Sequence, residues 1–115
     1  MIPEAIQTLQ AQLTQLHTQV QQANPDGTTL QGQFLAAQQQ FQSQVLLLGD
    51  DSNPALPPIL TEMNRTFRLL AMDVAFLQAA RQPLKAQQRQ QHMGEKILHL
   101  LGFCQALSQG LNSVD

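Results

Sequence analysis

Four long segments of this sequence carry apolar residues at alternating steps of three and four, and prolines and glycines separate them. Such steps follow the period of an α-helix, so each segment predicts an amphipathic helix with one buried face. No segment shows the two-residue period of a strand. The first predicted helix covers residues 3–22, and its apolar stripe is Ile2, Ile6, Leu9, Leu13, Leu16 and Val20.

The second predicted helix begins at Thr28, a candidate N-cap, with Gln31 three residues later to complete a capping box. The segment "GDDSNPALPP", residues 49–58, ends this helix and predicts the longest and most mobile connection. The apolar stripe between these limits is Leu30, Phe34, Ala37, Phe41, Val45 and Leu48.

The third predicted helix starts at Pro57 or Pro58, because proline suits the first helical position. It carries two apolar stripes, which indicate either contact with two neighbouring helices, the favoured interpretation, or one buried face and one face open to a partner. The main stripe is Leu60, Met63, Phe67, Leu70, Val74 and Leu77, and the second stripe is Leu69, Met72 and Phe76.

Gln82 and Pro83 end the third helix, and Pro83 can begin the fourth. The stripe of the fourth helix is Ala86, Met93, Ile97, Leu100, Cys104, Leu107 and Leu111. Short connections between long helices favour antiparallel neighbours. Residues 1–115 are therefore predicted to form one all-α domain, an antiparallel up-down-up-down four-helix bundle.

Charge and composition exclude several function classes. Glutamine, with 22 residues, supplies much of the polar surface, and only 12% of the chain is charged. The formal net charge of residues 1–64 is −5 and that of residues 65–115 is +3. Such an asymmetry can steer a partner, but six scattered basic residues are not typical of a nucleic-acid-binding surface. A single cysteine, with no signal peptide or membrane-spanning run, predicts a cytoplasmic protein without membrane insertion.

The sequence offers little for catalysis or metal binding. Glu-x-x-His, which a di-iron bundle requires, is absent, and His92, Glu95 and His99 are expected to lie away from the core stripe of the fourth helix. Cys104 lies on that stripe, where a thiol usually acts as a small apolar side chain. We therefore expect no enzyme activity, no catalytic residues, no metal and no cofactor.

Asp73 lies at the edge of the main stripe of the third helix and needs a partner if it is covered. In an antiparallel hairpin it would face residues near Arg89 and His92, so we expect a structural ion pair that sets the hairpin register. Arg81 is expected to extend along the end of the core stripe. Pro83 and Cys104 are also assigned structural roles.

A diffuse basic surface is expected from Arg65 and Arg68 on the third helix and from Lys85 and Arg89 on the fourth. These four residues are the candidate partner-binding residues. Ordinary solvated charge is the other interpretation of this surface, and the favoured one. A homodimer through the second stripe or through the first helix also stays open.

The segment "FRLLAMDVAFLQAARQPLKAQQRQQHM", residues 67–93, followed by "HLLGFCQAL", resembles the PatD family of cyanobacteria, the heterocyst frequency control proteins. The resemblance implies a small, cytoplasmic, non-enzymatic protein that binds the tubulin-like division protein FtsZ and favours its assembly. It further implies an effect on cell division and, in filamentous species, on heterocyst frequency. The alternative function is a ligand- or metal-binding helical bundle.

Overall fold

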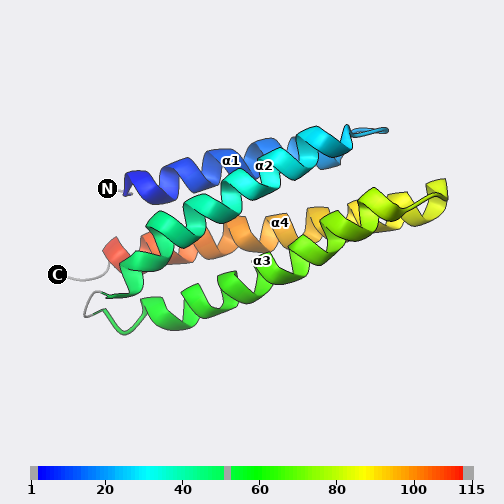
Figure 1. The fold of residues 1–115 in the computed structure, drawn as a ribbon. Helices are drawn as coiled ribbons and strands as arrows, with labels where there is room; N and C mark the ends of the chain where they lie inside the picture. The colour runs from blue at the N-terminus through cyan, green and yellow to red at the C-terminus, as the bar shows by residue number, and fades with distance from the viewer. Residues whose placement is uncertain (1–2, 51–52, 113–115) are drawn as a thin grey trace.

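A computed structural model describes residues 3–50 and 53–112, and all the regular secondary structure in this part of the chain is helical, with no strand. The four α-helices are α1 (Glu4–Val20), α2 (Gly27–Gln40), α3 (Leu56–Ala79) and α4 (Pro83–Asn112). A π-helix (Phe41–Val45) and a 3-10 helix (Leu46–Asp50) follow α2 directly. The helices lie along one long axis in a body of 52 × 20 × 19 Å (Figure 1).

Side-chain amides join the end of one helix to the beginning of another. Because each amide donates to a backbone carbonyl near a helix terminus, these bonds fix which termini lie together. The bonds run from Gln40 to Ala5 (3.1 Å), from Gln78 to Gly27 (2.7 Å), from Gln90 to Val20 (3.0 Å) and Gln22 (2.9 Å), and from Asn53 to Gly110 (3.2 Å).

The core consists of the four predicted main stripes together with Leu56, which belongs to none of them. Most of their members are buried, and Leu48, Leu77 and Leu111 are partly buried and pack against them. Ile2 lies outside the described residues. The periodicity therefore predicted correctly which face of each helix turns inward, because burying an apolar side chain contributes about 1.5–3 kcal/mol.

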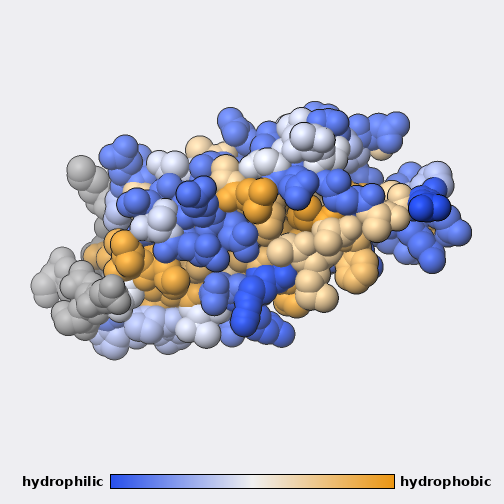
Figure 2. Space-filling view, viewed as in Figure 1, coloured by the Kyte–Doolittle hydropathy of each residue, from blue (hydrophilic) through white to orange (hydrophobic). Residues whose placement is uncertain are grey.

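The second stripe of α3 is exposed, so the favoured prediction that a neighbouring helix buries it is wrong. Leu69 is 37% exposed, Phe76 51% and Met72 54%. At 100° per residue these side chains lie nearly opposite the core stripe of α3. Figure 2 shows hydrophobic surface along the α3 part of the molecule.

The helix starts differ slightly from prediction. Asp26, not Thr28, caps α2, and its Oδ2 accepts hydrogen bonds from the Thr29 hydroxyl (2.6 Å) and backbone N–H (3.0 Å). The Thr29 hydroxyl and then its N–H lower the pKa of Asp26. A carboxylate accepts such bonds more strongly than a hydroxyl and is favoured by the positive end of the helix dipole. In α3, Leu56 begins the helix and the two prolines follow in its first turn.

The predicted second helix keeps its stripe but changes its hydrogen-bond pattern. In the π-helix, Phe41 and Val45 both point into the core with 0% exposure, on the same face that an α-helix would give residues four apart. A tighter 3-10 segment follows before the connection to α3. Residues 51–52 of that connection lie outside the described residues, so the structure does not test the prediction that this connection is mobile.

Gly102 offers a test of helix propensity in α4. It is exposed, and an added Cβ would meet nothing within 4 Å. We expect Gly102→Ala to raise the free energy of unfolding by about 1 kcal/mol, because glycine loses more backbone entropy in a helix than alanine does. Urea unfolding measures the change. Gly49→Ala is the control and should not stabilise, because its Cβ would lie 2.8 Å from Leu60 Cδ1. An unchanged midpoint for Gly102→Ala would contradict the expectation.

Candidate functional site

A buried carboxylate joins α3 to α4. The Asp73 side chain is 4% exposed, and its Oδ1 lies 3.0 Å from Arg89 Nη1. Its Oδ2 lies 2.6 Å from Lys96 Nζ. Arg89 and Lys96 are two helical turns apart, so both side chains leave α4 on the same face. One carboxylate is thus held by two cations, and the cluster keeps one net positive charge.

This cluster contains the pairing expected from the hairpin geometry, with two differences. His92, the other predicted neighbour, is exposed and makes no described ion pair with Asp73, while Lys96 was not anticipated. The sequence signal for Lys96 was its position seven residues after Arg89. Asp73 is also more deeply buried than a residue at the edge of a stripe, because both long cationic side chains cover it.

Arg89 connects the buried cluster to the surface. Its guanidinium carbon lies 4.7 Å from the ring centroid of Phe76, a cation–π distance. Its side chain is 35% exposed, because the ion pair with Asp73 and the contact with the Phe76 ring cover part of it. The Arg89 guanidinium thus binds the Asp73 carboxylate and also restrains the half-exposed Phe76 ring.

A groove opens beside this ring, between the end of α3 and the beginning of α4. Its volume is about 410 Å³. Phe76, Ala79 and Ala80 contribute apolar wall, and Lys85 and Arg89 contribute positive charge. The groove therefore combines an aromatic surface with cations, a composition that suits an anionic group next to an apolar one.

The remaining predicted basic residues are spread over α3 and the following turn. Arg68 is exposed, and Arg65 is exposed with its Nη1 3.8 Å from Glu62 Oε2, a surface pair of little energetic weight. Arg81 is exposed in the connection after Ala79, where α3 has already ended, so its predicted place along the core stripe is wrong. Ala80 has extended torsions, which turn the chain before Pro83 begins α4.

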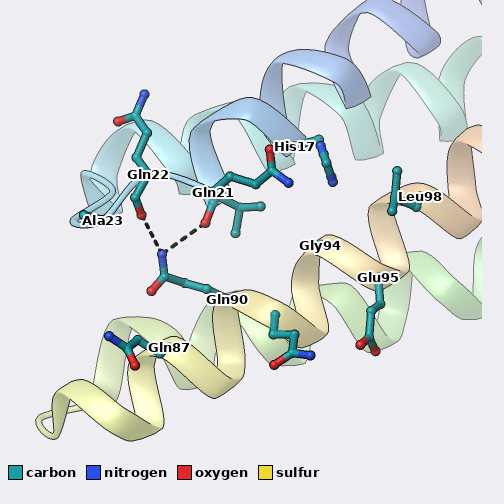
Figure 3. A pocket seen from close by; sticks show the side chains of 11 residues that line it. His17, Gln21, Gln22, Ala23, Gln87, Gln90, Gly94, Glu95 and Leu98 are labelled. Carbon is teal, nitrogen blue, oxygen red and sulfur yellow. Dashed lines mark hydrogen bonds between the residues drawn. The ribbon is translucent and has the colours of Figure 1, made fainter.

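A second groove, of about 610 Å³, lies between α1 and α4 (Figure 3). Gln90 closes one end by donating to the Val20 and Gln22 carbonyls. The figure shows the Glu95 carboxylate pointing away from His17. Five glutamines and four apolar residues or glycines line most of the wall, and Glu95 is its one acid, so this groove presents no concentrated charge.

Metal ligands do not gather in the described part of the chain, where no group of three His, Cys, Asp or Glu residues is placed to hold an ion. His92, Glu95 and His99 are all exposed, as expected from their angular position. Within residues 3–50 and 53–112, every helix is too short or too polar to cross a bilayer.

Cys104 is buried among the core residues with 0% exposure, and this burial raises its pKa to about 12. We expect a thiol-reactive dye at pH 8 to label the native protein far more slowly than the urea-unfolded protein, because only the thiolate reacts. Equal labelling rates would contradict this placement.

Alkaline pH should also destabilise the fold. The Cys104 thiol of the unfolded chain ionises near its ordinary pKa of 9.0 and that of the native protein near 12, so the free energy of unfolding falls as pH rises between these values.

The chain was also compared with known proteins. No family model matches it, no curated protein matches it, and no solved structure matches it.

Proposed function

We propose that this chain is a non-enzymatic protein that binds FtsZ and promotes its assembly. The observation that carries a binding function is the exposed apolar stripe of α3, Leu69, Met72 and Phe76, which runs beside exposed basic residues. Contiguous exposed apolar side chains commonly mark protein–protein interfaces. The resemblance of residues 67–93 to the PatD family supplies the identity of the partner.

The proposed scaffold is a single domain, an antiparallel up-down-up-down four-helix bundle. Its support is the set of amide bonds between helix termini. Gln40, at the end of α2, bonds to Ala5 at the beginning of α1, and Gln90, near the beginning of α4, bonds to Val20 at the end of α1. Such pairings suit helices that run in opposite directions.

The proposed contact surface uses three of the four predicted basic residues directly. Arg65, Arg68 and Lys85 are exposed on the α3–α4 side of the molecule. Arg89 contributes indirectly, because it pairs with the buried Asp73 and stacks on the Phe76 ring of this surface. Such a protein would act in the cytoplasm, on cell division and, in filamentous cyanobacteria, on heterocyst frequency.

Sedimentation of FtsZ filaments tests the proposal. We expect the protein to pellet with FtsZ and to increase the amount of polymer, and we expect both effects to weaken as salt rises, since surface charges are screened. Charge reversal at Arg65 and Arg68 should weaken binding, whereas reversal of Arg81, an exposed cation beyond the end of α3, is the matched control. No co-sedimentation and no change in polymer yield would refute the proposal.

The alternative proposal is a ligand- or metal-binding bundle, for which the α1–α4 groove of about 610 Å³ is the available space. Elemental analysis and visible absorption of the purified protein distinguish the two. A bound metal or chromophore in stoichiometric amount would favour this alternative.

A further inference from the structure

We infer that the outward side of α3 docks an acidic amphipathic helix of a partner protein. We call this surface the α3 docking face and define it by Arg65, Arg68, Leu69, Met72 and Phe76. The inference rests on the proposed partner-binding function and adds the kind of segment that is recognised and the residues that recognise it.

The apolar part of the α3 docking face has the spacing of a helix-binding surface. Leu69, Met72 and Phe76 follow at i, i+3 and i+7, so they form a straight line about 10 Å long on α3. Each is between one third and just over one half exposed. A line of this length accommodates the i, i+3, i+4 and i+7 anchors of one amphipathic helix.

Charge selects an acidic occupant. Arg65 and Arg68 lie at one end of the apolar line, and Lys85 lies in the groove beside Phe76 at the other. The nearby acid Asp73 is buried and held by two cations, so it offers no compensating charge at the surface. At the first end the exposed Glu62, whose Oε2 lies 3.8 Å from Arg65 Nη1, offsets one of the two arginine charges, so one net positive charge remains there. The face is thus apolar along its middle and carries net positive charge toward both ends, which complements a helix with acidic residues flanking its apolar side.

The aromatic anchor is held in place before any partner arrives. Arg89 stacks on the Phe76 ring at 4.7 Å and is itself fixed by its 3.0 Å bond to Asp73. Lys96 completes the cluster from the next turns of α4. A ring restrained in this way loses less conformational entropy on binding than a free side chain, which favours affinity.

A second copy of this chain fits the face less well. Pairing two α3 docking faces would bring Arg65, Arg68 and Lys85 of one copy toward the same residues of the other, and like charges at an interface are costly. An anionic membrane fits less well too, because the three apolar side chains lie partly covered along a folded helix and present a narrow line rather than a broad inserting face.

A designed peptide tests the face independently of FtsZ. The probe is a fluorescent helical peptide of about 18 residues with leucines along one side and glutamates on the flanks. The matched peptide replaces every glutamate with lysine. We expect the acidic peptide to bind the full chain in a salt-dependent way, and the basic peptide not to bind.

Substitutions then locate the site. We expect Met72→Glu and Phe76→Ala each to weaken acidic-peptide binding by about tenfold or more, as for central interface residues. Leu98→Glu is the matched control, because Leu98 is 53% exposed but lines the α1–α4 groove. It should leave binding within about twofold. Circular dichroism of each variant verifies that it is folded.

Several outcomes would overturn the inference: equal binding of the two peptides, loss of binding only in Leu98→Glu, or a wild-type dimer in light scattering that Met72→Glu dissociates. Binding to phosphatidylglycerol vesicles without peptide binding would also overturn it. FtsZ pelleting with the same variants separates the two proposals. If wild type and Met72→Glu pellet equally with FtsZ, the α3 docking face is wrong and FtsZ binding stands. If the protein never pellets with FtsZ but binds the acidic peptide, FtsZ binding is wrong and the α3 docking face stands.

Discussion

Replacing Asp73 with alanine is expected to lower the free energy of unfolding by about 3–5 kcal/mol, the cost of removing one partner from a buried ion pair. The loss arises because Arg89 and Lys96 remain near each other without the carboxylate that neutralises them. Their side chains are 35% and 24% exposed, so water relieves part of the penalty and the lower end of that range is the better expectation. Urea unfolding followed by circular dichroism measures the change.

Two further variants define the cause. Asp73→Asn keeps the size of the side chain and removes only its charge, so it should recover little of the loss. Glu62→Ala is the matched control on α3, because Glu62 is an exposed carboxylate whose pairing with Arg65 at 3.8 Å contributes little. If Asp73→Ala costs no more than Glu62→Ala, the cluster does not stabilise the α3–α4 hairpin.

Phe67→Ala is expected to cost about 3–5 kcal/mol, as for other buried phenylalanines. The Phe67 ring is 1% exposed and lies 5.0 Å from the Phe41 ring and 6.4 Å from the Phe34 ring, so its removal leaves a cavity where α3 meets α2 and the π-helix. Urea unfolding is again the measurement. Phe76→Ala is the matched control, since the same residue type on the same helix is half exposed there and should cost much less. Equal losses would mean that the aromatic contact is not central to the core.

Much of the helical fold could be predicted from the sequence because apolar periodicity and proline position are local signals. The stripes of all four helices and the start of α4 at Pro83 follow from them. Details of hydrogen bonding did not follow. The apolar stripe does not distinguish a π-helix from an α-helix at Phe41–Val45, and more than one polar residue before α2 can cap it, so neither the π-helix nor the Asp26 cap could be predicted.

The candidate site was predictable only where the hairpin geometry constrained it. The pairing of Asp73 with Arg89 follows from the position of the turn, whereas the second cation, Lys96, lies two turns further and competes with other residues for the same carboxylate. The stacking of Arg89 on the Phe76 ring was not predicted, because it depends on how far apart the two helices lie.

The sequence by itself determined the helices, their inward faces and the presence of a second apolar stripe on α3. Only the tertiary structure decided that this stripe is exposed and that the adjacent basic residues divide into Arg89, which supports the surface, and Arg65, Arg68 and Lys85, which lie on it. The physical reason is that periodicity reports which residues share a face of a helix. Whether another helix covers that face depends on how residues distant in the chain pack together.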